Sequence, residues 1–194
     1  AYRRGKSLSD GENVLIDFAS YEPSYKAAAA FISTPIYSDA DLVGVLVFQM
    51  PLDRINRLMT YSGQWQQSGL GDSGETYILG GDQLLRSASR FQTEDPSGFA
   101  QALERSGVEG ELVDYFERGG SAIGKLAIDT EAARMALEGN QGVVTQQDYR
   151  GEWVVSAFGP LDIAGVDWAI LSEQDVAEAF AAVEALKGEV VFWA

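Results

Sequence analysis

Two arginines spaced four residues apart have the clearest capacity for ligand chemistry in this sequence. Arg86 and Arg90 flank Ser87 and Ser89 in a chain of 194 residues with 29 acidic and 14 basic side chains, a formal net charge of −15. A guanidinium can donate two parallel hydrogen bonds to a carboxylate, so this cluster could hold the carboxylate of a ligand. In so acidic a chain the arginines could equally pair with the protein's own acids.

Polar aromatic side chains and one acid on nearby predicted strands add to this cluster. Such residue types line small-molecule pockets, although they also occur in ordinary cores and on surfaces. We therefore predict a binding site for a small molecule such as an amino acid or a carboxylate. The predicted ligand contacts are Tyr77, Arg86, Ser87, Ser89, Arg90, Asp148, Tyr149 and Trp153.

The absence of cysteine and histidine excludes several kinds of catalytic site. A chain without them has no thiolate nucleophile, no Ser-His-Asp triad and no cysteine-ligated zinc. Acidic pairs such as Asp148 with Glu152, or Glu173 with Asp175, could serve as general acid and base, but a solvated acidic surface is the simpler interpretation. We expect no catalytic residue, no metal and no cofactor, and the negative charge argues against nucleic acid as a partner.

Two glycine motifs resemble phosphate-binding loops but lack the required context. The GxGxxG motif at 69–74 precedes a predicted strand, whereas a dinucleotide site needs it after a strand and at the start of a helix. Gly119 and Gly124-Lys125 have P-loop spacing, but Leu126 stands where a hydroxyl should hold magnesium. Both motifs are therefore interpreted as loops.

The elements that must position these residues alternate between strands and helices. β-branched and apolar runs predict strands, whereas apolar residues at helical spacing and capping residues predict helices. The predicted strands are 14–18, 31–37, 42–50, 76–79, 84–87, 142–149, 152–158 and 166–171, with 76–79 and 84–87 forming a hairpin. The predicted helices begin at Pro51 and at Asp95-Pro96 and cover 109–116, 130–138 and about 173–187.

A weak internal repeat suggests two copies of one α/β unit. Residues 31–51 and 158–173 both read as a strand, a proline followed by an apolar residue, a turn, a Gly-Val strand and a helix. The second copy has a hairpin and helices before it, whereas the first has only about 30 residues before it.

Six stretches together resemble the double Cache sensor domains of bacterial transmembrane receptors, which are found in chemoreceptors, nucleotide cyclases and histidine kinases. They are DFASYEPS (17–24), AAFISTPI (29–36), GVLVFQMP (44–51), GLGDSGETYIL (69–79), RSASRF (86–91) and GVDWAIL (165–171). The resemblance implies an α+β fold of PAS-like antiparallel sheets flanked by helices. It also implies two such modules stacked along a long N-terminal helix, which has no counterpart in this sequence.

The resemblance implies a specific domain organisation. Residues 1–60 would be the C-terminal half of a distal module, 61–69 a linker, 70–172 a complete membrane-proximal module, and 173–194 a helix leading to a membrane span. Ligands of this family often bind the distal module, so the principal pocket would be incomplete here.

The implied function is that of an extracytoplasmic, periplasmic ligand-sensing region. Such a region relays a small helix displacement to a cytoplasmic output domain, in a receptor expected to be a homodimer. The apolar residues 190–194 would begin the membrane span, although they could also anchor the chain end on the domain. A free-standing periplasmic binding protein and, less favoured, a carboxylate enzyme are the alternatives.

Overall fold

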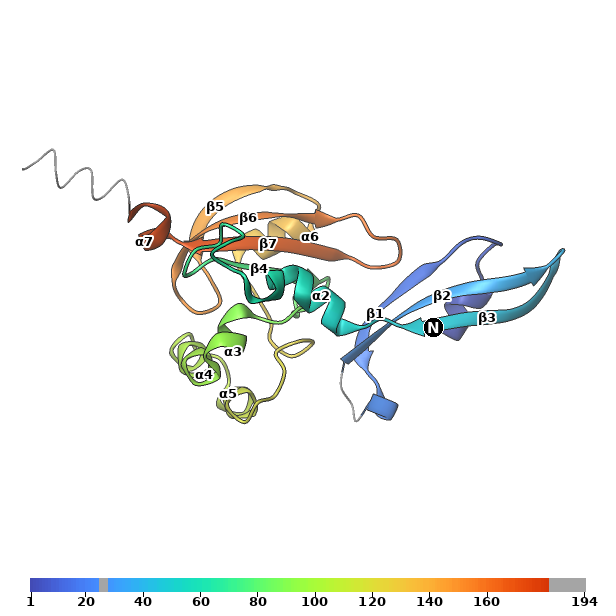
Figure 1. Cartoon of the computed structure of the whole chain (residues 1–194), viewed down its shortest axis with the longest axis horizontal. Helices are drawn as coiled ribbons and strands as arrows, with labels where there is room; N and C mark the ends of the chain where they lie inside the picture. The colour runs from blue at the N-terminus through green and yellow to red at the C-terminus, as the bar shows by residue number, and fades with distance from the viewer. Residues whose placement is uncertain (25–27, 182–194) are drawn as a thin grey trace, which may run out of the picture.

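Two antiparallel sheets lie one after the other along the long axis of the protein in the computed structural model (Figure 1). The structure describes residues 1–24 and 28–181. A three-stranded sheet has the order β1-β2-β3, and a four-stranded sheet has the order β4-β7-β6-β5. Helices accompany both sheets, so the predicted α+β class is confirmed.

The three-stranded sheet is built from the first part of the chain. Its strands are β1 (Val14–Ser20), β2 (Ala28–Ser38) and β3 (Asp41–Gln49), which confirm the three strands predicted there. A short helix that the sequence did not predict, α1 (Tyr2–Lys6), lies against β2 and β3. Gly5 permits this close approach, because a Cβ atom there would collide with the side chains of Ser33 and Val45.

A shared apolar cluster joins the two sheets. Helix α2 (Leu52–Met59) follows β3 and contributes Leu52, Ile55 and Met59 to it. Phe18 of β1 and Trp168 of the other sheet stack in this cluster with ring centroids 6.0 Å apart. The short 3₁₀ turns are η1 (Glu22–Ser24) and η2 (Tyr61–Gly63).

The four-stranded sheet carries the larger core. Its strands are β4 (Glu75–Gly80), β5 (Gly142–Gln147), β6 (Trp153–Leu161) and β7 (Trp168–Asp175). Its helices are α3 (Arg90–Glu94), α4 (Pro96–Arg105), α5 (Gly110–Glu117) and α6 (Glu131–Leu137), with the first three grouped on one side of the sheet in Figure 1. The helices predicted at α4, α5 and α6 are confirmed, whereas α3 was not predicted. The side chains of Asp95 and Thr130 cap α4 and α6 by accepting bonds from Gly98 N and Ala133 N.

The predicted hairpin of 76–79 with 84–87 is present only as a short bridge and not as a regular second strand. The Gly80 N–H donates to the Leu84 carbonyl at 3.0 Å, and the Arg86 N–H donates to the Ile78 carbonyl at 2.7 Å. After β4 the chain makes only isolated bridges at Leu84 and Leu85. The Leu85 N–H donates to the carbonyl of Leu126, and Ser87 turns its hydroxyl back to the Ile78 N–H, 3.0 Å away. The segment 84–87 therefore stays beside β4, but the bonds of Leu85 to Leu126 and of the Ser87 side chain to Ile78 interrupt a regular ladder.

The predicted start of the last helix, near residue 173, is also wrong. Strand β7 continues to Asp175, because Glu173 still pairs with Glu75 of β4 and Ser156 of β6. Helix α7 (Val176–Ala179) begins only after it. The rest of the predicted helix and the apolar residues 190–194 lie outside the described residues, and within the described part no helix is both long and apolar enough to span a membrane.

Candidate functional site

Three of the eight predicted site residues meet inside the four-stranded module. The Tyr149 hydroxyl donates to Glu75 Oε2 at 2.6 Å, and the Tyr77 hydroxyl donates to Glu173 Oε2 at 2.9 Å. Ser89 Oγ lies 2.9 Å from the Tyr149 hydroxyl. Because that hydroxyl gives its single proton to Glu75, Ser89 is the donor between the two. We call these five residues, together with Gln146, the buried polar cluster.

Burial perturbs the acids of the buried polar cluster. It raises the pKa of Glu173 to about 7, and repulsion by Asp148 and Glu75 adds to this, against the hydrogen bond from Tyr77. Burial also raises the pKa of Glu75, although the hydrogen bond from Tyr149, with Ser89 behind it, and the bond from the Arg90 N–H oppose the shift. Both tyrosine hydroxyls have a pKa raised well above the usual value, chiefly by burial, so they remain neutral donors.

Arg86 is fully engaged with the protein's own acids, the second of the two interpretations that the sequence left open. Its Nε and Nη2 atoms donate to the two oxygens of Asp17, both at 2.8 Å, and Nη2 also contacts Asp82 at 2.9 Å. The Trp168 indole donates to the same Asp17 carboxylate at 2.8 Å. Burial raises the pKa of Asp17, but these hydrogen bonds outweigh it and the net pKa is lowered.

Arg90 holds a loop rather than facing a cavity. Its Nη1 donates to the carbonyls of Gly74 at 2.7 Å and Gly71 at 3.1 Å, and its Nε donates to Glu94 at 2.9 Å. The guanidinium also lies 4.8 Å from the ring centroid of Trp65. Arg90 therefore fixes residues 71–74 against the start of α3.

The remaining predicted residues lie apart from one another. Asp148 is buried and accepts from Arg150 Nε at 2.6 Å and from the backbone of Arg150 and Glu152. Trp153 is 57% exposed, because alternate residues of β6 face opposite sides and Val154 is the one that points inward.

A groove opens beside the β5–β6 turn. Its larger part is a cavity of about 570 Å³ beside the turn residues Asp148, Tyr149 and Arg150 and Arg105 at the end of α4. The segment before α6 also lines it, through Leu126, Ala127, Asp129 and Thr130. A second cavity of about 270 Å³ shares Arg105, Arg150 and Glu152 with it. We call the two cavities together the Arg105 groove.

Some charged side chains of the Arg105 groove have hydrogen-bond partners within the protein, and others have none. Arg150 donates to Asp148 and, through Nη2, to Asp175 at 2.7 Å, and it stacks on Phe91 with 3.7 Å between the guanidinium carbon and the ring centroid. Among the described residues the side chains of Arg105 and Glu152 have no hydrogen-bond or ion-pair partner. They can therefore engage a ligand without breaking a bond of the protein.

The sequence analysis did not predict Arg105 as a residue of the groove. It also did not predict Glu75 and Glu173 as members of the buried polar cluster. A signal for Glu75 was present, because it lies two positions before Tyr77 and alternation along a strand places both on one face. Arg105 and Glu152 come together only through the packing of α4 beside the β5–β6 turn, which no local pattern indicates.

Comparison with known proteins identifies the fold. No family model matches the chain, and no curated protein matches it. Solved structures do: the extracellular domain of the putative histidine kinase mmHK1S-Z3 aligns with a TM-score of 0.56 and 16% identity, covering 95% of this chain and 56% of that domain. The ligand-binding domain of the Pseudomonas aeruginosa PAO1 amino acid chemoreceptor PctB, in complex with L-Arg, aligns with a TM-score of 0.53 and 14% identity over 93% of this chain and 60% of its own.

A further neighbour extends the comparison to a different ligand. The ligand-binding domain of the Pseudomonas aeruginosa PAO1 chemoreceptor PctC, in complex with GABA, gives a TM-score of 0.50 at 14% identity, covering 90% of this chain and 60% of that one. The predicted resemblance to Cache-type sensor domains is thus confirmed for the fold. The chain spans somewhat more than half the length of these neighbours, which are extracellular or ligand-binding domains of receptors.

Proposed function

We propose that this chain is the extracytoplasmic ligand-sensing region of a transmembrane signalling receptor. Its fold is that of extracellular ligand-binding domains of histidine kinases and chemoreceptors, and two of those neighbours hold L-Arg and GABA. The ligand would be a small molecule such as an amino acid or a carboxylate, and the full receptor would be a membrane-anchored homodimer facing the periplasm.

The Arg105 groove is the binding site in this proposal. Its volume lies within the range typical of small-molecule sites, and Arg105 and Glu152 offer opposite charges without a partner among the described residues. Arg105 suits a ligand carboxylate and Glu152 suits an amino group. Of the eight residues predicted from the sequence, Asp148 and Tyr149 line this groove.

The unpartnered charges of Arg105 and Glu152 are the observation that carries the proposal. Arg150 would connect the groove to α7, and through α7 to a cytoplasmic output domain. Its guanidinium forms part of the groove wall and bonds to Asp175, the residue immediately before α7. A ligand that binds better to one position of Arg150 than to another would shift the position of α7 by its differential affinity.

Isothermal titration calorimetry with a panel of L-amino acids, GABA and small dicarboxylates tests the proposal. We expect at least one member to bind, and Arg105→Ala to weaken its binding by about tenfold or more, because a hydrogen bond to a charged group contributes roughly 1.5–3 kcal/mol. Arg118→Ala is the matched control, since this arginine is largely exposed on the surface beside α5. A panel without any binder, or equal effects of the two substitutions, would contradict the assignment.

A further inference from the structure

Two buried carboxylates face each other across β4 and β7. Glu75 and Glu173 are directly paired in the strand register and are only 2% and 4% exposed. Glu75 accepts from the Arg90 backbone N–H and the Tyr149 hydroxyl, both at 2.6 Å. Glu173 accepts from the Tyr77 hydroxyl at 2.9 Å and from Gln146 Nε2 at 3.4 Å. Every one of these donors is a neutral group.

No described arginine or lysine side chain forms an ion pair with either carboxylate. The nearest cationic influence is Arg150, which acts on Glu75 at longer range and is already bonded to Asp148 and Asp175. Asp148 adds a further negative charge toward Glu173. Two buried like charges without a counter-ion are unfavourable, so such a pair retains a proton.

Neutral groups from the other elements complete the surroundings of the pair. Ser89, before α3, faces Glu75 through Tyr149, and Ser156 of β6 is the register partner of Glu173. The Gln146 amide is oriented by Ala132 of α6, whose N–H donates to its Oε1 at 2.9 Å, so the amide nitrogen is directed toward Glu173. These groups can stabilise one negative charge in the pair but none supplies a positive one.

The pair lies where α7 is attached to the sheet. Glu75 directly follows the loop 71–74, and Glu173 lies two residues before Asp175. The N–H groups of Asp72 and Ser73 donate to the Glu178 carboxylate of α7, both at 2.8 Å. Repulsion between Glu75 and Glu173 would therefore separate the two strand ends that hold α7 in place.

We propose that the Glu75–Glu173 pair is a proton switch that holds one proton in mildly acidic surroundings and loosens the attachment of α7 when the proton is lost. Burial raises the pKa of both groups, and that of Glu173 to about 7. The second charge therefore appears as the pH rises through about 7, and the junction is tighter below this pH than above it. The switch responds to protons and needs no ligand in the Arg105 groove.

Hydrogen exchange of the intact chain between about pH 5.5 and pH 8.5 tests the coupling to α7. After correction for intrinsic exchange, we expect protection of the Asp72 and Ser73 amides and of residues 176–180 to fall by about tenfold or more as the pH rises. Glu173→Gln should remove this dependence, because the amide cannot ionise. The exposed Glu104→Gln should behave as the wild type does. Protection that is independent of pH in the wild type would overturn the proposal.

Infrared spectroscopy of the wild-type protein tests the proton itself and does not depend on a variant that folds. We expect the carbonyl stretch of a protonated carboxyl group at about pH 6, and its loss as the pH rises through about 7. Spectra showing only ionised carboxylates at about pH 6 would overturn the proposal. The double variant Glu75→Gln/Glu173→Gln, where it folds, should lack the titrating band.

Discussion

At the scale of single residues, the bond between Arg86 and Asp17 determines how the two sheets are joined. The sequence predicts Arg86 as a ligand contact, and its capacity for bidentate binding of a carboxylate was recognised correctly. The carboxylate that it binds comes from Asp17, 69 positions earlier in the chain. A local motif gives the chemistry of a side chain but not its partner, because the partner is brought to it by the packing of β1 against the other sheet.

Asp17→Asn should destabilise the protein by about 2–3 kcal/mol. The substitution replaces the bidentate Asp17 carboxylate by a neutral amide and leaves the half-exposed Asp82 as the charged partner of the buried Arg86 guanidinium. The estimate lies below the usual 3–5 kcal/mol because Asp82 remains and the Asp17 side chain is 31% exposed. Urea denaturation measures the change. Asp114→Asn, in the exposed pair with Arg118, should be nearly neutral, and a double-mutant cycle of Asp17 and Arg86 should show strong coupling. Additive effects in that cycle would show that the bond does not stabilise the fold.

At the scale of elements, periodicity and capping located most helices and strands, whereas inward-facing polar residues misled the prediction. Glu173 and Asp175 made the end of β7 look like the acidic face of a helix. In the structure Glu173 is buried and Asp175 binds Arg150, so the strand continues. A charged side chain inside a sheet contradicts the usual alternation of apolar and polar residues. Asp175 directly precedes α7, and its N–H donates to the Ser73 hydroxyl at 3.1 Å.

The attachment of α7 should also weaken in acid, through Glu178. Hydrogen bonds from the Ser73 hydroxyl and the Asp72 N–H lower the pKa of Glu178 to about 2. A lowered pKa gives a stabilisation that is complete above the ordinary value, near 4.5, and is lost as the pH falls toward 2. The amide resonances of Asp72 and Ser73 should therefore move over this range in NMR spectra.

Glu178→Gln provides the control for this titration. At neutral pH the variant should already show the chemical shifts that the Asp72 and Ser73 amides of the wild type reach in acid. These shifts should change little when the variant is acidified. Identical titrations in the wild type and the variant would assign the shift to another acid. Combined with the proton switch of Glu75 and Glu173, the lowered pKa of Glu178 predicts that α7 is held best between about pH 4.5 and pH 7.

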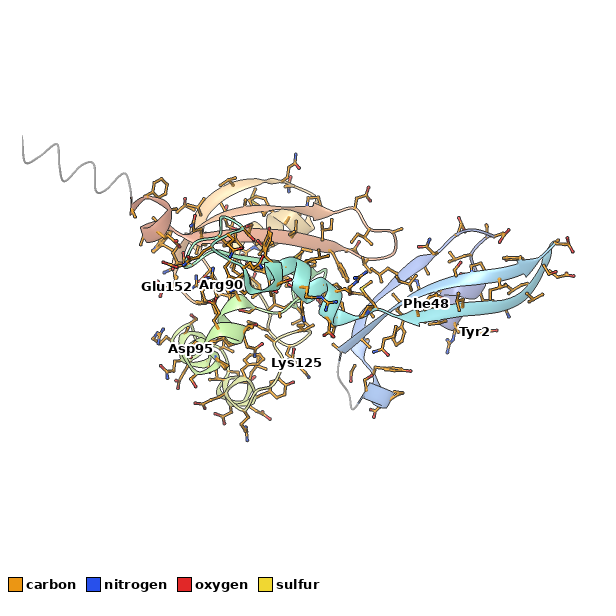
Figure 2. The ribbon with its side chains drawn as sticks, in the orientation of Figure 1. Tyr2, Phe48, Arg90, Asp95, Lys125 and Glu152 are labelled. Carbon is orange, nitrogen blue, oxygen red and sulfur yellow. The ribbon has the colours of Figure 1, made fainter. Side chains whose placement is uncertain are left out.

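At the scale of the whole molecule, the two sheets differ in how much core they possess. The core of the four-stranded module contains buried residues from strands β4, β6 and β7 and from helices α4, α5 and α6, and Val144 of β5 packs against it. One face of the three-stranded sheet leaves large apolar side chains exposed, among them Phe48, labelled in Figure 2 far from Asp95 and Glu152. The exposed apolar residues on this face are Ile32, Ile36, Leu46 and Phe48.

This difference supports the predicted boundary at 61–69, and we propose that the four-stranded module folds without residues 1–60. A fragment beginning at residue 61 should show native near-ultraviolet circular dichroism and a single thermal transition, whereas a fragment of residues 1–60 should not fold. The free energy of unfolding of the fragment that begins at residue 61 should be lower than that of the whole chain. In this fragment Ile78 and Trp168 lose the apolar partners that β1 and α2 supply.

Ile78→Ser in the fragment separates this loss from a general failure to fold. In the whole chain the substitution should destabilise, since Ile78 is 6% exposed in the cluster that joins the sheets. In the fragment Ile78 has lost those neighbours, so the same substitution should change stability much less. Equal effects in both proteins, or a fragment without a cooperative transition, would mean that the sheets form one folding unit and that the boundary at 61–69 divides no independent domains.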